Sequence, residues 1–384
     1  IPAAEWGMAT TFEQAQEIVE GLGFPVMVRP SFVLGGRAMA VVFDPEGLAK
    51  YMREAVLVSE DQPVLIDRYL DGAQELDIDL VCDGHDVAIA GLLAHIEEAG
   101  IHSGDSYAVL PALGVAPDVL EQVRMQSKQL ALTLGVRGLI NLQWAVKEGR
   151  AYCLEANPRA SRTVPFVSKA TGIDWAGVAA RIGLGQTLRQ QGIQDGLPRQ
   201  ISVKGVVFPF AKFPSVDPIL GPEMKSTGEV MGIGENFGEA YAKALLAAGI
   251  PLPSSGNVFV SVNEHDKARL KELGTKITQL GFTMCATEGT ALALRSYGFE
   301  VRTVYKVNEG RPNVVDLLKN GEIQWVINTP LGRTAFFDES AIRKESLRLK
   351  IPSLTNMNAA LAACEAIESF QHTLQIRSLQ SLVP

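Results

Sequence analysis

The chain has 384 residues, 47% of them hydrophobic and 20% charged, a balance typical of globular proteins with two or three domains. Its net charge of −8 disfavours non-specific nucleic-acid binding, and no apolar run is long enough to span a membrane. The four cysteines are far apart and form no CxxC pair, which predicts reduced thiols in a cytoplasmic protein. The five scattered histidines give no zinc pattern.

The part up to about residue 190 alternates helical and strand patterns. Apolar spacing predicts helices at 11–23, 44–58 and 117–134. Strands are predicted at 24–31, 40–44 and 63–70. Two hairpins follow, one turning at Asp83-Gly84 and one at residues 148–150. Antiparallel hairpins with interspersed helices predict an α+β domain over residues 1–190.

The second hairpin carries the first chemical signal. A three-residue loop at 148–150 would place Lys147 opposite Ala151 and Gln143 opposite Glu155. Side chains alternate along a strand, so Glu155 and the residue two positions on, Asn157, would then face Gln143. Such oxygen ligands suit Mg²⁺, with substrate phosphates completing its shell. The alternative is a polar strand end closed by a turn.

Further segments fit a nucleotide. Arg29 ends a strand before the flexible turn Gly35-Gly36, which precedes Arg37, and the backbone amides of such a turn can close over phosphates. The strand end at residues 68–70 offers a free backbone edge for adenine, and Glu75 offers a carboxylate for ribose hydroxyls. Residues 97–106 form a polar, glycine-bearing loop.

The rest of the chain divides in two. Residues 191–255 are rich in Gly and Pro and are predicted to be a connector with little regular structure. In residues 256–384, strands and helices alternate, which predicts a compact α/β domain with a parallel sheet.

The nucleotide and metal candidates of residues 1–190 together resemble those of an ATP-grasp domain. They are Arg29, Gly35-Gly36, Tyr69-Leu70 with Glu75, residues 100–103, Gln143, Glu155 and Asn157. Four longer motifs are similar in sequence to the C-terminal half of the large subunit of carbamoyl-phosphate synthetase. They are "VRPSFVLGGRAM", "GIHSGDS", "NPRASRTVPFVSKATG" and "LGPEMKSTGEVMG". The resemblance covers about residues 10–365. In that family this half phosphorylates carbamate with ATP and Mg²⁺ or Mn²⁺, for arginine and pyrimidine synthesis.

The resemblance implies a role for each matching residue. Arg159 and Arg162 would hold the carbamate and the transferred phosphoryl group, which suits phosphoryl transfer to an anion. Gln143, Glu155 and Asn157 would hold the metal ions. The nucleotide contacts would come from Arg29, Arg37, Arg68, Tyr69, Leu70, Glu75, Gly100, Ile101, His102, Ser103, Gln143 and Glu155.

The chain departs from the family pattern in two ways. It begins inside the ATP-grasp domain and lacks the first synthetase half, and it contains nothing like the glutaminase small subunit. The resemblance therefore implies a fragment with little activity alone. Glu97, Asp105 and Thr355 match expected ornithine contacts, but Gly205 stands where ornithine-activated relatives carry glutamate, which places ornithine control in doubt.

Residues 256–384 resemble the family's regulatory domain, which shares its fold with methylglyoxal synthase. "ATEGT" opens a helix directly after a strand, so its backbone amides can bind a phosphate, although ordinary capping explains the same pattern. The resemblance implies a pocket for a nucleotide monophosphate such as UMP or IMP. Its residues would be Lys267, Thr287, Thr290, Lys306, Asn328 and Thr329, with Pro330 in place of a hydroxyl residue found in relatives.

Other readings are a different ATP-grasp ligase, a methylglyoxal synthase, or a non-catalytic module for effector binding and oligomerisation. The stretch "RTVPFVSKATG" argues against a biotin carboxylase relative. Methylglyoxal synthesis needs positioned carboxylates, and the "ATEGT" loop has no aspartate. The expected partners are therefore carbamate, the rest of a large subunit, a glutaminase subunit and a nucleotide effector, with neither nucleic acid nor membrane.

Overall fold

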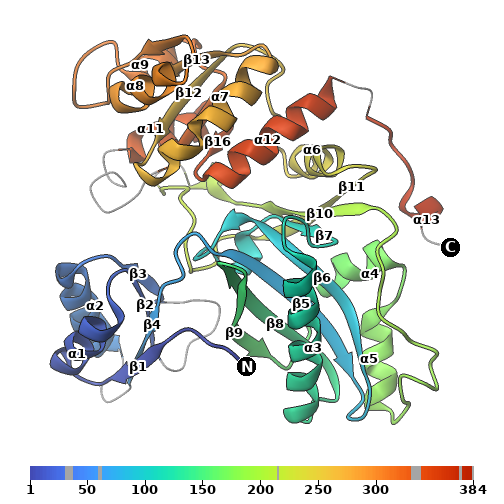
Figure 1. The fold of residues 1–384 in the computed structure, drawn as a ribbon. Helices are drawn as coiled ribbons and strands as arrows, with labels where there is room; N and C mark the ends of the chain where they lie inside the picture. The colour runs from blue at the N-terminus through green and yellow to red at the C-terminus, as the bar shows by residue number, and fades with distance from the viewer. Residues whose placement is uncertain (31–37, 59–62, 214–215, 330–338, 372–373, 383–384) are drawn as a thin grey trace. The chain divides into compact units, whose positions relative to one another are not determined.

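The computed structural model describes residues 1–30, 38–58, 63–213, 216–329, 339–371 and 374–382 (Figure 1). The Gly35-Gly36 turn, Arg37 and Pro330 lie outside the described residues. The chain divides into two compact units. Unit 1 comprises Ile1–Lys204, Leu220–Lys225 and Arg377–Pro384, and unit 2 comprises Gly205–Ile219 and Ser226–Ile376. None of the helices described has the length and apolar character needed to cross a membrane.

Unit 1 begins with a four-stranded antiparallel sheet in the order β1-β4-β2-β3. The helix predicted at 11–23 is confirmed as α1, since the Thr11 hydroxyl caps it by accepting from the Gln14 amide at 3.3 Å and Gly23 ends it. Apolar residues of α1 and α2, among them Val19 and Leu48, pack against the strands. The elements are β1 (Trp6–Ala9), α1 (Phe12–Leu22), β2 (Val26–Pro30), β3 (Ala40–Val42), α2 (Pro45–Val58) and β4 (Val64–Arg68).

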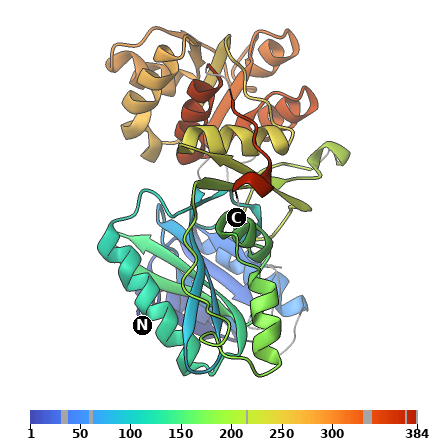
Figure 2. The same ribbon diagram turned by 90° about the vertical axis from the view of Figure 1, so that its right-hand side faces the viewer.

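A second, larger sheet carries the two predicted hairpins. Its strand order in unit 1 is β10-β7-β6-β5-β8-β9, all antiparallel, and helices α3, α4 and α5 pack against β5, β6 and β8 (Figures 1 and 2). The Trp144 indole lies on the face that α3 covers, where it donates to Ser127 of α3 at 3.0 Å. The elements are β5 (Gln74–Cys82), β6 (Val87–Glu98), η1 (Ser103–Asp105), β7 (Ala108–Leu110), α3 (Pro117–Thr133), β8 (Gly138–Lys147), β9 (Arg150–Asn157), α4 (Val164–Thr171), α5 (Trp175–Gly183) and β10 (Ile201–Val207).

The prediction of little regular structure over 191–255 is wrong. Strand β10 continues past Lys204 into unit 2, where β11 (Gly228–Gly234) is its neighbour and α6 (Phe237–Ala247) follows. One glycine of this stretch, Gly232, serves close packing. A Cβ atom on Gly232 would collide with the backbone of α6 at Ala240 and Ala244.

The predicted α/β domain with a parallel sheet is confirmed in unit 2. The five strands run in the order β14-β13-β12-β15-β16, and every pair is parallel. One apolar cluster joins the sheet to α7, α8 and α12, and another joins it to α9 and α11. The elements are β12 (Asn257–Val262), η3 (His265–Arg269), α7 (Leu270–Gln279), β13 (Thr283–Ala286), α8 (Glu288–Ser296), β14 (Val301–Thr303), α9 (Val314–Lys319), β15 (Trp325–Thr329), α11 (Ser340–Arg348), β16 (Ser353–Leu354) and α12 (Met357–Phe370).

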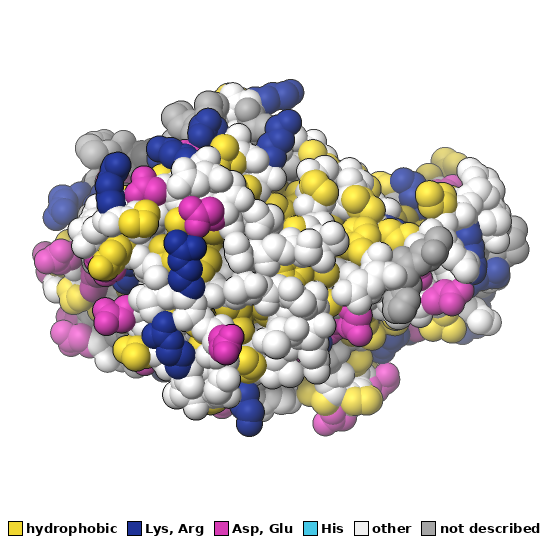
Figure 3. All heavy atoms as spheres, turned by 90° about the horizontal axis from the view of Figure 1, so that it is seen from above, with side chains coloured by type: hydrophobic (Ala, Val, Ile, Leu, Met, Phe, Trp, Pro, Cys, Tyr) yellow, Lys and Arg dark blue, Asp and Glu magenta, His cyan; other side chains and the backbone are white. Residues whose placement is uncertain are grey.

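The surface charge is mixed on the face that Figure 3 shows. Lys and Arg side chains lie there singly, between acidic and apolar ones, and do not gather into one basic patch.

Replacing Gly232 by alanine is expected to destabilise unit 2 by about 1–3 kcal/mol, because the added methyl group overpacks a contact between two backbones. Urea unfolding measures the loss. Gly228→Ala on the same strand is the control, since a Cβ there would lie 3.6 Å from Val207, an ordinary contact. Equal stability of the two variants would contradict the packing argument.

Candidate active site and effector site

One face of the large sheet in unit 1 is polar. Along β5, Glu75, Asp77 and Asp79 alternate with apolar residues, and all three carboxylates are buried. On the neighbouring strand β8, Gln143 pairs with Asp77 and Asn141 pairs with Asp79. Directly paired residues share a face, so the amides and carboxylates form one polar surface, opposite the face that α3 covers.

The turn of the second hairpin differs from the prediction. Lys147 pairs with Arg150, so the loop contains only Glu148 and Gly149, and the predicted pairing of Lys147 with Ala151 is wrong. Both loop residues have positive φ, 52° and 73°, as in the type I′ turns that suit the twist of two-residue hairpins.

The predicted pair of Gln143 with Glu155 is nevertheless confirmed. The register shifts after Trp144 pairs with Cys153, and the bulge leaves Leu154 as one extra residue on β9. This insertion compensates for the shorter turn. It returns Glu155 and Asn157 to the face of Gln143.

The three predicted metal ligands therefore lie on one face of neighbouring strands. Glu155 is exposed, while Gln143 and Asn157 are half-buried. The Gln143 amide nitrogen donates to the Ser103 hydroxyl at 2.9 Å, which leaves its carbonyl oxygen for a cation. No group of three His, Cys, Asp or Glu side chains within the described ranges is suited to a metal. One carboxylate with two amide oxygens fits Mg²⁺ bound partly by phosphates.

The loop of residues 100–105 lies against the same face. The Gly100 amide donates to Glu75 at 3.0 Å, and the His102 amide donates to the Gly221 carbonyl at 2.9 Å. Gly100 has a φ of 94°, and a Cβ there would meet the Tyr69 hydroxyl, so no larger residue fits without strain. Tyr69 itself donates to the Ala99 carbonyl at 2.6 Å. Glu75, Tyr69 and the loop are thus brought together as predicted.

His102 connects this loop electrostatically to the second hairpin. Burial lowers the pKa of its imidazole, the charges of Asp105 and Glu155 oppose this shift, and Arg162 adds to it. Both predicted residues of the hairpin region therefore lie near enough to act on the histidine. Its Nδ1 atom accepts from the Gly104 amide at 3.0 Å, a bond that favours the neutral ring.

The sequence analysis missed a buried histidine beneath the loop. His95 bridges Asp77, at 2.9 Å from Nε2, and Glu75, at 3.3 Å from Nδ1. Burial disfavours the imidazolium, but the two carboxylates outweigh it and raise the pKa of His95 to about 9. The alternating acids of β5 were the available signal, because buried carboxylates need cationic or hydrogen-bonding partners.

A second missed cluster surrounds Asp79. Its carboxylate accepts from Thr163, from Ser161 at 2.7 Å and from Asn141 at 3.0 Å. Burial raises the pKa of Asp79 to about 6, although these hydrogen bonds oppose the shift. The cluster anchors the backbone on either side of Arg162.

The remaining predicted nucleotide residues lie at or near the first sheet. Arg29 donates to Asp67 at 3.0 Å and is partly buried. Arg68 is exposed and pairs with Glu5 at 2.6 Å, and the Leu70 carbonyl accepts from Ala73 at 3.1 Å. The exposed Arg159, beyond β9, donates only weakly to Ala160 at 3.4 Å.

The predicted effector residues gather at the carboxyl edge of the parallel sheet in unit 2. Thr287 and Thr290, both buried, lie 3.4 Å apart between hydroxyls, and Ser261 approaches Thr287 at 3.3 Å. Thr287 stands at the N-cap position of α8, but its side chain makes no capping hydrogen bond. Capping of the helix therefore does not explain the threonine at this position. Thr329 accepts from the Asn263 amide at 3.2 Å.

Asn328 belongs to a network that includes a missed acid, Glu339. The Asn328 amide donates to Glu339 at 2.7 Å, and Arg343 donates to the Asn328 carbonyl at 3.3 Å. Arg343 is fully buried and bonds Asp217 through two nitrogens, at 2.9 and 2.7 Å. Burial raises the pKa of Glu339, and Asn328, Arg343 and Lys306 oppose the rise.

The two predicted effector lysines lie at the same edge. Lys306 is exposed after β14. Lys267, in η3, pairs with Glu264 at 2.6 Å. Two cations beside hydroxyl and amide groups can bind a phosphate.

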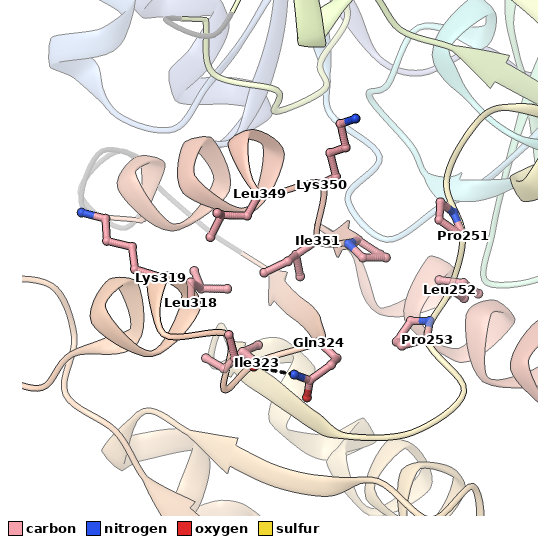
Figure 4. Close-up of a pocket in the computed structure, with 12 residues that line it drawn as sticks. Pro251, Leu252, Pro253, Leu318, Lys319, Ile323, Gln324, Leu349, Lys350 and Ile351 are labelled. Carbon is pink, nitrogen blue, oxygen red and sulfur yellow. Dashed lines mark hydrogen bonds between the residues drawn. The ribbon is translucent and has the colours of Figure 1, made fainter.

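A hollow of about 520 Å³ lies at the opposite, amino edge of this sheet (Figure 4). Its lining precedes β12, β15 and β16, and Gln324 within it is occupied by hydrogen bonds to Gly321 and Asn257. The hollow is therefore separate from the effector residues.

Comparison with known proteins agrees with this geometry. Residues 1–191 match the family described as "Carbamoyl-phosphate synthase L chain, ATP binding domain", and residues 269–355 match "MGS-like domain". Among solved structures, the biotin carboxylase domain of Hydrogenobacter thermophilus 2-oxoglutarate carboxylase, in complex with MgADP and bicarbonate, has a TM-score of 0.53 at 18% identity, covering 64% of this chain and 62% of that one. At this identity the likeness shows the fold alone.

Relatives much closer in sequence are called carbamoyl phosphate synthase large chain. One from Acidobacterium capsulatum is 52% identical over 100% of this chain and 36% of its own length. One from Methanosarcina barkeri is 48% identical over 99% of this chain and 96% of its own length. The "C-terminal section" from Aquifex aeolicus is 48% identical over 98% and 74%. The chain thus spans about a third of the longer relatives, and it belongs to the carbamoyl phosphate synthase large-chain family, with an ATP-grasp ATP-binding domain followed by an MGS-like domain.

Proposed function

We propose that this chain phosphorylates carbamate with ATP and Mg²⁺ or Mn²⁺, forming carbamoyl phosphate and ADP for arginine and pyrimidine synthesis in the cytoplasm. The proposal is supported by the names of relatives about 50% identical and by the MgADP bound to a protein of the same fold. The observation that carries it is the convergence of Gln143, Glu155 and Asn157 beside the loop of residues 100–105.

Each part of the nucleotide would meet its own group of the predicted residues. Arg29 and Arg37 would bind its phosphates, and the strand end at residues 68–70 would meet adenine. Glu75 would meet the ribose hydroxyls, beside the loop of residues 100–103. Gln143, Glu155 and Asn157 would hold Mg²⁺, which neutralises phosphate charge when bound.

The transfer needs positioned cations more than a base, because the acceptor is already an anion. A carbamate oxygen attacks the γ-phosphorus, the bond to the β,γ-bridging oxygen breaks, and ADP leaves with that electron pair. Arg159 and Arg162 would hold the carbamate and the moving phosphoryl group by forked hydrogen bonds. The Asp79 cluster would fix Arg162 through its chain neighbours Ser161 and Thr163.

Carbamate must come from elsewhere. This chain spans about a third of the longer relatives, so about two thirds of their length lies outside the part that it matches. The expected partners are the rest of such a large subunit and a glutaminase subunit, in an oligomeric assembly. Unit 2 would bind UMP or IMP at Lys267, Thr287, Thr290, Lys306, Asn328 and Thr329. The uncapped start of α8 supports this, because its free amides attract phosphate.

The reverse partial reaction tests the proposal directly. Carbamoyl phosphate and MgADP should yield ATP when the chain is joined to the segments present in its longer relatives, and UMP should alter the rate. Absence of ATP formation in that full assembly would contradict the proposed activity.

Glu155→Gln is expected to lower this ATP formation by roughly 100-fold, because it removes the single carboxylate of the proposed metal site. Glu148→Gln, on the exposed turn of the same hairpin, is the matched control and should keep the full rate. Raising the Mg²⁺ concentration should recover part of the lost rate. Similar rates for the two variants would exclude Glu155 as a ligand.

Lys306→Ala should weaken UMP binding by about tenfold, as expected for loss of one charged hydrogen bond to phosphate. Isothermal titration calorimetry on the chain measures this. Lys319→Ala is the control, since Lys319 is also exposed but lines the hollow at the amino edge of the sheet. Unchanged UMP affinity in Lys306→Ala would remove this lysine from the effector site.

A further inference from the structure

Lys204, in β10, is a buried cation without a role in the site described above. Only 1% of the residue is exposed, although charged lysines are rarely buried without partners. It is the last residue of unit 1 before the chain enters unit 2. In the sheet it pairs with Ala108 of β7.

The hydrogen bond of Lys204 goes to the nucleotide loop. Its Nζ atom donates to the backbone carbonyl of Ser103 at 2.8 Å. Its charge also acts on two buried acids. It adds to the effect of His95, which lowers the pKa of Asp77, and it opposes the burial that raises the pKa of Glu97 to about 7. The low polarity of this interior strengthens the bond to the carbonyl.

A lysine that only neutralises buried acids would be expected to touch one of them. The ion pairs within 4.0 Å in the described part of the chain join Lys204 to no carboxylate. Its donated hydrogen bond is made to the loop backbone instead. The contact therefore indicates that Lys204 orients the loop, with the acids balancing its charge from further away.

We propose that Lys204 is a positioning residue for nucleotide binding, holding the Ser103 carbonyl so that the Ser103 hydroxyl and Gln143 stay aligned. The Ser103 hydroxyl accepts from Gln143 at 2.9 Å, so one residue is held from two sides. The Glu75 bond to Gly100 fixes the start of the loop, and Lys204 fixes its end. This inference rests on the proposed ATP site and deepens it.

Hydrogen–deuterium exchange of the complete chain without nucleotide tests the positioning itself. Lys204→Met should speed exchange of the amides in residues 100–106 by about tenfold, because the loop loses its anchor. Lys204→Arg, which keeps the charge and donors, should restore slow exchange. Lys128→Met is the control, since Lys128 is a half-buried lysine of unit 1 that bonds Asp195 and makes no bond to the loop. Unchanged exchange in Lys204→Met would overturn the proposal.

Binding of MgADP, measured by calorimetry, tests the consequence. Lys204→Met and Ser103→Ala should each weaken binding by about tenfold, and the double variant should lose little more, because both act through one residue. Fully multiplicative losses would overturn the proposed route. If the parent chain fails to bind MgADP, the proposed function fails while the exchange result still decides the loop. If Lys204→Met does not fold, Lys204→Gln replaces it.

Discussion

The polar face of the large sheet depends on the burial of three carboxylates along one strand, β5. Burial makes an unpartnered carboxylate costly, so each must find donors in the surrounding chain. Glu75 and Asp77 share the buried His95, and Glu75 also receives the Gly100 amide. Asp79 receives hydroxyls from the segment after β9. The loop of residues 100–105 and the segment that carries Arg162 are thus tied to the same strand, β5.

Unit 2 also brings polar and charged side chains together, but at the edge of a parallel sheet. Its parallel strands end at a common edge, where hydroxyl and amide side chains and the start of α8 converge. The half-buried carboxylate of Glu339 and the buried guanidinium of Arg343 lie just behind this edge, joined through Asn328. Arg343 ties the same network to Asp217 in the segment that follows β10. The proposed effector residue Asn328 is therefore joined, through Arg343, to Asp217 within unit 2.

Sequence reasoning succeeded where local patterns decide structure. Alternation along β8 and β9 placed Gln143 opposite Glu155, even though the predicted turn was one residue too long. The predicted pair is nevertheless present because the bulge at Leu154 restores the register. No local pattern in the sequence predicts that bulge. The glycines of residues 228–234 led to a wrong prediction. They suggested a loop, but they lie in a strand that packs directly on the backbone of α6.

The sequence alone was enough to predict the order and type of most elements and the faces on which the polar residues of the hairpins lie. These follow from periodicity and turn chemistry, which act between near neighbours in the chain. The family was recognised separately, from the resemblance of four long motifs. The partners of the buried charges became known from the folded structure: His95 for Asp77 and Glu75, Lys204 for the Ser103 carbonyl, and Arg343 for Asp217. Those partners are 18 to 126 positions apart in the sequence, and burial alone makes their pairing necessary.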